Sequence, residues 1–246
     1  MLVKTKSFTL AVRTEGDKNA SKVAIMLPGR LDTKDYANFV SHLEYLADKG
    51  FYAVAMDPPG TWESPGPIDL FTTTNYVKAV NELIEYFGNK PTLLLGHSRG
   101  GSIAVLAGCA NPNVIGLVLI MANYKAPTPA SPEAIKAGFK LETREVPPGT
   151  SKTFDTKVFK MPLSYFEDGQ KFIAGEAIKN CYEPKLMFYS QNDKYTSAEE
   201  FLEVFSSTPE PKIKYELHCD HDYRYSSEAI KEVNKVMGEF THKYLD

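Results

Sequence analysis

The hydrophobic positions of the chain fall into short continuous runs separated by longer stretches with helical spacing. A continuous apolar run of roughly 4 to 8 residues indicates a strand that is buried on both faces. The longer stretches repeat apolar residues every three or four positions, as amphipathic helices do. Alternation of the two predicts an α/β fold with a mostly parallel, doubly wound sheet and helices on both faces. The runs are 22–27, 51–56, 92–95, 114–121 and 185–189.

Turn and cap residues mark where the predicted helices begin and end. Asp32 and Thr33 are candidate N-caps of a first helix, and Gly50 stands where a left-handed C-terminal residue is wanted. A second helix ends at Gly88, and a third covers the small-residue stretch 98–110. Two further helices and an alternating strand around Tyr215 complete the C-terminal part of the predicted sheet.

Residues 123–180 break this regular alternation. Six prolines divide the segment into short mixed pieces: Pro127, Pro129, Pro132, Pro147, Pro148 and Pro162. A long interruption of this kind inside a compact domain is usually functional. We therefore expect one domain, 1–246, with 123–180 as a lid or cap insertion.

Composition narrows the classes of partner and location. The 246 residues carry a net charge of −3, and the basic residues are scattered, so no face for nucleic acid is expected. The N-terminus lacks the apolar core of a signal peptide, and no run approaches the roughly 18 residues that span a membrane. Cys109, Cys181 and Cys219 are an odd number at unrelated spacings, which indicates reduced thiols. A cytoplasmic protein is the expectation.

The strongest chemical signal is the sequence Gly-His-Ser-Arg-Gly at 96–100. It lies directly after a predicted strand and directly before a predicted helix, which is the setting of a nucleophile elbow. Glycines two residues to either side of Ser98 permit a tight turn that lifts the hydroxyl above the sheet edge. Ser98 is therefore the candidate nucleophile.

A serine nucleophile needs a base within reach and an acid that orients the base. In sites of this type the chain order is serine, acid, histidine. His221 follows the last strand in a loop that can return to Ser98, whereas His218 at the strand end is the weaker alternative. Asp193 follows the strand 185–189 and is the candidate acid. A zinc site around 218–221 is disfavoured, because no second cluster completes it, so no metal is expected.

The oxyanion formed during acyl transfer requires backbone N–H donors. One is expected from Arg99, the residue after the nucleophile, and a second from Arg30, with Leu31 as the fallback. The side chains of Arg30 and Arg99 are expected to be solvated at the surface.

These motifs resemble the α/β-hydrolase superfamily over nearly the whole chain. The segment 56–65, MDPPGTWESP, is similar to the D-x-P-G-x-G-x-S loop of that family, with Trp62 in place of its second glycine. The segment 221–224, HDYR, resembles the sequence around the family's catalytic histidine. Two departures are Pro28 before Gly29, where His-Gly is usual, and Ser190, where a glycine usually precedes the acid.

Within the superfamily, the insertion is similar to the small lid of cinnamoyl and feruloyl esterases and of monoacylglycerol-lipase-like hydrolases. That resemblance implies hydrolysis of carboxylic esters, with Leu31, His97, Tyr165 and Phe166 expected to contact the substrate. The lid aromatics could equally pack the insertion onto the body.

The expected reaction is attack by Ser98 on a small-molecule ester and hydrolysis of the acyl-enzyme, with no cofactor. A peptidase, thioesterase or lyase with the same residues remains an alternative, because fold alone does not choose among them. A ligand-binding protein with little turnover is the alternative from another class. The sequence does not predict the oligomeric state.

Overall fold

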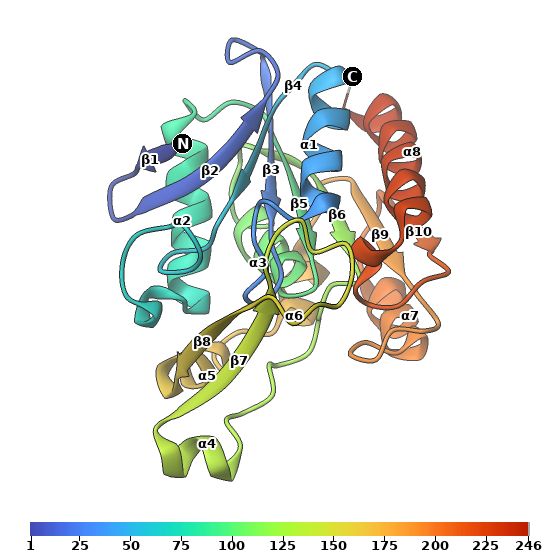
Figure 1. The fold of residues 1–246 in the computed structure, drawn as a ribbon. Coiled ribbons are helices and arrows are strands. Elements are labelled where there is room, and N and C mark those ends of the chain that lie inside the picture. The colour runs from blue at the N-terminus through green and yellow to red at the C-terminus, as the bar shows by residue number, and fades with distance from the viewer. Residues whose placement is uncertain (246) are drawn as a thin grey trace.

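The computed structural model describes residues 1–245 and shows one eight-stranded sheet (Figure 1). The sheet order is β1-β2-β4-β3-β5-β6-β9-β10, and every pairing from β4 to β10 is parallel. β2 pairs antiparallel with both of its neighbours, β1 and β4. Residue 246, the last of the predicted single domain, lies outside the described residues. The strands are β1 (Leu2–Lys4), β2 (Thr9–Glu15), β3 (Lys22–Leu27), β4 (Phe51–Met56), β5 (Thr92–His97), β6 (Val114–Ile120), β9 (Lys185–Tyr189) and β10 (Lys212–Glu216).

Helices cover both faces of the sheet, as predicted. α1 (Ala37–Asp48) and α8 (Ser227–Tyr244) lie side by side on one face, whereas α2 (Thr73–Tyr86), α3 (Arg99–Gly108) and α7 (Ala198–Ser207) lie on the other (Figure 1). Strand β3 supplies both cores: Ile25 packs toward α2 and α3, and Met26 packs toward α1 and α8. Burial on both faces explains why the central strands are continuously apolar.

The register of the central strands brings the predicted site together. Leu27 pairs with Gly96 and His97 pairs with Ile120, so β3, β5 and β6 end at the same edge. A Cβ on Gly100 would lie 1.9 Å from the carbonyl oxygen of Leu27. Glycine is therefore required at position 100 for α3 to pack this closely against the end of β3.

The segment 123–180 forms its own small layer between β6 and β9. Its strands β7 (Phe139–Glu145) and β8 (Thr156–Pro162) pair antiparallel and extend from the body, with the short helix α4 (Pro132–Ala137) at the far end (Figure 1). This hairpin is absent from the sequence prediction, which expected only short mixed pieces. The segment also contains α5 (Leu163–Gly169), α6 (Ala174–Ala177) and η2 (Ile178–Asn180), and the remaining short helices are η1 (Ile68–Leu70) and η3 (Tyr223–Tyr225).

The predicted helix ends are partly confirmed. Gly50 and Gly88 take left-handed φ angles of 84° and 81° after α1 and α2. Asp32 and Thr33 are not N-caps, because α1 begins later, with Tyr36 in the cap position. Thr33 Oγ1 instead donates to Asp57 Oδ1 at 2.8 Å, which ties the loop after β3 to the end of β4.

The prediction of three reduced cysteines is wrong. Cys109, at the end of α3, is joined by a disulfide to Cys181, directly after η2, with their Cα atoms 4.8 Å apart. Folding brings together two cysteines that are 72 residues apart in sequence, and spacing alone could not show this. Cys219 is free. The thiol argument for a reducing compartment is therefore removed.

No helix in residues 1–245 combines the length and the apolar character needed to cross a membrane.

Candidate active site

Ser98 occupies a strained turn between a buried strand and a helix. Its φ of 52° and ψ of −120° lie outside the regions that non-glycine residues normally adopt. Such strain persists only where the surroundings enforce it, and it clusters at functional sites. Here β5 and α3 hold the turn, so Ser98 is presented at the carboxyl edge of the sheet.

The predicted acid and base lie in direct contact. His221 Nδ1 and Asp193 Oδ1 are 2.9 Å apart, although 28 residues separate them in sequence. The Asp193 side chain is almost fully buried and also accepts the backbone N–H of Tyr195 at 2.8 Å. Burial alone would raise the pKa of Asp193, but the hydrogen bond and charge of His221 and nearby backbone N–H groups hold it below its usual value. Asp193 is therefore ionised at neutral pH and acts as the acceptor.

The side chain of His97 holds in place the loop that carries His221. Nε2 of His97 lies 3.0 Å from the carbonyl oxygen of His221, and the two rings are 4.9 Å apart. On its other side, His97 Nδ1 faces Asp32 Oδ2 at 3.5 Å. A side chain next to the nucleophile thus positions the loop of the base.

A cavity of about 460 Å³ brings the predicted residues together. Its volume lies in the range of small-molecule sites. Predicted site residues in its lining are Arg30, His97, Ser98, Arg99, Tyr165 and His221. Asp193 is not in the lining, because it lies behind the His221 ring.

Two residues expected to contact substrate are not in the cavity lining. Leu31 is fully buried in the apolar core, and its carbonyl oxygen accepts the indole N–H of Trp62 at 2.8 Å. Phe166 is buried in the same core, with its ring 5.1 Å from that of Tyr165. Phe166 therefore packs the insertion onto the body, whereas Tyr165 also faces the cavity.

Of the two residues whose amides are expected to stabilise an oxyanion, Arg99 directly follows Ser98 and Arg30 lines the same cavity. The N–H of Arg99 is the first of α3, where a helix offers no internal acceptor. The N–H of Arg30 makes no backbone hydrogen bond within residues 1–245. Both residues line the cavity, and the oxyanion hole stays a prediction.

The sequence prediction missed a charged wall of the cavity. Arg144 contacts Asp32 at 3.5 Å, and Arg224 contacts Glu145 at 3.0 Å. Burial would raise the pKa of Asp32, but His97, Arg144 and Arg224 hold it below its usual value. The alternating pattern at 139–145 was a signal for the strand that carries Arg144 and Glu145, and the HDYR segment already contained Arg224. Neither signal indicated that these charges would line the site.

The side chain of Arg99 corrects a second expectation. It is only 8% exposed and lines the cavity, so it is not solvated at the surface as predicted. Arg30 is partly exposed and contacts Glu142 at 3.2 Å.

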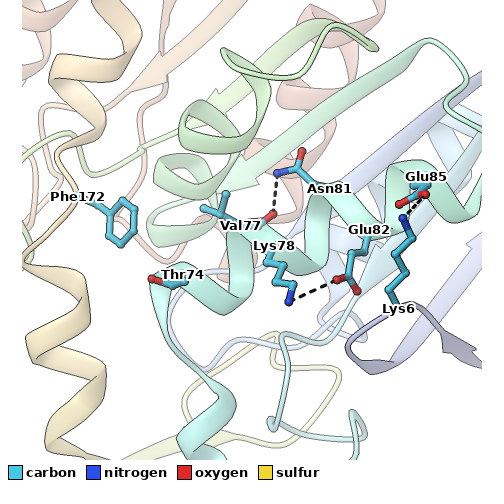
Figure 2. A pocket seen from close by; sticks show the side chains of 8 residues that line it. All are labelled: Lys6, Thr74, Val77, Lys78, Asn81, Glu82, Glu85 and Phe172. Atoms are coloured by element: carbon cyan, nitrogen blue, oxygen red, sulfur yellow. Dashed lines mark hydrogen bonds and ion pairs between the residues drawn. The ribbon is translucent and has the colours of Figure 1, made fainter.

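A second depression, of about 510 Å³, lies along α2 (Figure 2). Its charges are paired: Lys6 contacts Glu85 at 2.6 Å, and Lys78 faces Glu82 at 3.9 Å. This surface therefore offers no unpaired group for catalysis or binding. The remaining lining residues are Thr74, Val77, Asn81 and Phe172.

Metal-ligating groups do not gather at the 218–221 segment. Within residues 1–245, no cluster of three or more His, Cys, Asp or Glu side chains could hold a metal ion. The side chain of His218 is 83% exposed beside Glu216, away from the Ser98 cavity. Of the two candidate bases, only His221 reaches that cavity.

Comparisons with known proteins identify the fold family of the chain. A mitochondrial palmitoyl-protein thioesterase of Bos taurus, ABHD10, is 25% identical over 166 residues, which cover 67% of this chain and 50% of that protein. A 2-hydroxy-6-oxononadienedioate/2-hydroxy-6-oxononatrienedioate hydrolase of Pseudomonas putida is 22% identical over 222 residues, or 76% of each chain. The structure is similar to Est1E of Butyrivibrio proteoclasticus, solved with ferulic acid bound, with a TM-score of 0.77, 16% identity and coverage of 100% and 99% of the two chains. The family model of the alpha/beta hydrolase fold matches residues 23–145. The chain therefore belongs to the alpha/beta hydrolase fold family.

Proposed function

We propose that the protein is a serine hydrolase that cleaves small-molecule carboxylic esters, with Ser98 as nucleophile, His221 as base and Asp193 as orienting acid. The observation that carries the proposal is the 2.9 Å contact between His221 and Asp193, in a loop that reaches the same cavity as the strained Ser98 turn. Three separate strand ends supply these groups, as a built catalytic site requires.

The ionised Asp193 accepts a hydrogen bond from Nδ1–H of His221, which leaves the lone pair on Nε2. That nitrogen takes the proton of Ser98 as the hydroxyl attacks the ester carbonyl carbon. The amides of Arg30 and Arg99 stabilise the oxyanion, and loss of one such donor typically costs roughly 3 kcal/mol of transition-state stabilisation. His221 then protonates the departing alcohol and activates the water that hydrolyses the acyl-enzyme.

The segment 123–180 is proposed as the lid of this site. Tyr165 and Phe172 line the cavity from this segment, and Thr143 and Arg144 line it from the β7–β8 hairpin. An ester bound at Ser98 would therefore contact both the body and the insertion. Est1E, which has the same fold and was solved with ferulic acid bound, supports the proposal of a small-molecule substrate but not of a lid.

Steady-state hydrolysis of a p-nitrophenyl ester series tests the proposal. Ser98→Ala should fold normally and lose activity by at least ~10⁴-fold, because no other group can form the acyl-enzyme. Ser102→Ala is the matched control: it removes a hydroxyl that lines the same cavity from α3, the helix that follows Ser98, and most activity should remain. Equal activity of wild type and Ser98→Ala would refute the assignment of the nucleophile.

A thioester should be included in the series, because one similar protein is named as a palmitoyl-protein thioesterase. A higher kcat/KM on an S-acyl substrate than on its oxygen ester would move the proposed reaction to thioester hydrolysis with the same three residues. We propose a cytoplasmic location, which fractionation of the native source would test.

A further inference from the structure

The guanidinium of Arg99 is buried between three elements of the cavity wall. Nη2 donates to Thr73 Oγ1, at the start of α2, at 2.6 Å. Cζ lies 4.5 Å from the ring centroid of Tyr165 in α5 and 5.9 Å from that of Phe71. These contacts fix the side chain in one place, so its charge is held at a defined position in the Ser98 cavity.

No acid neutralises this charge within residues 1–245. The ion pairs of the described chain, taken to 4.0 Å, include none with Arg99, and its Nε is buried without a partner. The other arginines that line the cavity differ. Arg30 contacts Glu142, Arg144 contacts Asp32, and Arg224 contacts Glu145. Because an unpaired buried charge is costly, a partner for Arg99 is expected from outside the chain.

The remaining hydrogen-bond donors define the chemistry of that partner. Nη1 of Arg99 donates to no residue in the described part of the chain, and it is not among the buried atoms that lack a partner. Thr73, which also lines the cavity, uses its oxygen as an acceptor for Arg99 and keeps its own O–H to donate. Two donors from two helices thus stand side by side. A carboxylate, which offers two acceptor oxygens, matches this pair.

We propose that Arg99 and Thr73 bind a free carboxylate of the substrate, so that the preferred ester carries a second, unesterified carboxyl group. This inference rests on the proposed ester hydrolysis at Ser98, and it specifies the substrate class. The anion can belong to the acyl part, as in a half-ester of a dicarboxylic acid, or to the alcohol part, as in an ester of a hydroxy acid.

Matched substrate pairs test the inference and distinguish the two sources. The acyl pair is the p-nitrophenyl half-ester of glutaric acid and p-nitrophenyl pentanoate, which differ by carboxylate against methyl. The alcohol pair is 4-(butanoyloxy)benzoate and phenyl butanoate. The ratio of kcat/KM for the anionic over the neutral member is the readout, because any effect on the Arg99 backbone donor cancels in it. Wild type should prefer one anionic member by about 10-fold or more, as expected of a charged hydrogen bond.

Variants assign the preference to Arg99. Arg99→Met should lower the ratio by about 10-fold or more, mainly through KM, and Arg99→Lys should restore part of it. Lys125→Met removes a cation of the cavity lining that already has an acid partner, Glu200, so its ratio should stay near that of wild type. Thr73→Val should lower the ratio by a smaller factor, and it provides a second route if Arg99→Met does not fold.

Failure of this inference is distinguishable from failure of the proposed function. Ser98-dependent turnover with no anionic preference, or with an equal preference in Arg99→Met, would overturn the carboxylate site and leave the esterase intact. If no ester is hydrolysed, calorimetric titration of Ser98→Ala with monomethyl glutarate decides the matter: binding that is lost in Ser98→Ala/Arg99→Met supports the site, and no binding overturns it.

Discussion

Two walls of the Ser98 cavity each contain a buried arginine, but carboxylates of the described chain neutralise the charge at only one of them. Arg224, in η3, is surrounded by acceptors: Glu145 at 3.0 Å, Tyr225 Oη at 2.6 Å and Asp222 at 3.6 Å. Arg99, in α3, has aromatic rings and one threonine hydroxyl. In both arginines Nε lacks a hydrogen-bond partner. The two differ because, within residues 1–245, carboxylates contact Arg224 and not Arg99.

The difference separates a structural charge from one available for binding. At the Arg224 wall, Glu145 of the insertion neutralises the charge of Arg224 of the body. This ion pair ties the β7–β8 hairpin to the loop of His221. At the Arg99 wall, the fold holds a cation one residue from the nucleophile and leaves its neutralisation to another molecule. Removal of either arginine should therefore affect different properties: stability for Arg224 and substrate preference for Arg99.

The largest effect is expected from Arg224→Met. This change leaves Glu145 half-buried beside Tyr225 with no cation, and breaking a buried pair in this way typically costs roughly 3 kcal/mol or more in the free energy of unfolding. Urea unfolding at neutral pH measures it. The double variant Arg224→Met/Glu145→Gln should recover part of the loss, because it removes the orphaned charge. Unchanged stability in Arg224→Met would mean that this wall does not depend on its ion pair.

A smaller, pH-dependent effect on stability is expected from a network of uncharged side chains that includes Tyr223, the residue before Arg224. His42 is fully buried: its Nδ1–H donates to Asn234 Oδ1 at 2.6 Å, and its Nε2 accepts the hydroxyl of Tyr223 at 2.9 Å. Asn38 Nδ2 donates to the same Tyr223 oxygen. Burial lowers the pKa of His42 to about 4, against the opposing hydrogen bond of Asn234. The network therefore requires uncharged His42.

The sign of the pH dependence follows from proton binding. Between pH 6.5, the usual pKa of histidine, and about 4, the unfolded chain binds a proton at His42 that the folded chain excludes. The free energy of unfolding therefore falls on acidification, by about 2 kcal/mol between pH 7 and pH 5. Urea titrations of wild type and His42→Gln at both pH values isolate this contribution. Equal losses in the two proteins would show that His42 is not the group responsible.

The body of the fold was predictable because its patterns are local. The strands 22–27 and 51–56 were predicted to the residue, since burial on both faces makes them continuously apolar. The proposed residues Ser98, Asp193 and His221 could be singled out from the sequence because each lies at or shortly after the end of a strand that the parallel sheet fixes. Asp32 resembled a helix cap in sequence. Its contacts with Arg144 and His97, which place it in the cavity wall instead, form only in the folded chain.

The alternation at 139–145 was a local signal for a strand, but the face of that strand that meets the body was not predictable, because the alternation is inverted. Along β7, Leu141 is exposed, whereas Glu142 and Arg144 turn toward the body and the cavity. A strand that faces its apolar side outward does not match the usual pattern of apolar-in and polar-out residues. The partners that make this favourable, Asp32 and Arg30, lie more than a hundred residues away in sequence. Long-range ion pairs of this kind leave no local signal.

The smallest expected change in stability gives the most direct test of the difference between the Arg99 and Arg224 walls. Arg99→Met should alter the free energy of unfolding by no more than about 1 kcal/mol, in either direction, because the change removes a buried charge that has no acid partner. Loss of the Thr73 hydrogen bond and of the contact with Tyr165 opposes that gain. Urea unfolding beside Arg224→Met measures the contrast directly. If Arg99→Met proved as destabilising as Arg224→Met, the guanidinium of Arg99 would be a structural group, and the two walls would not differ as described. A stable Arg99→Met protein would instead show that the fold does not need this charge, which leaves recognition of an anionic substrate as the reason for its place beside Ser98.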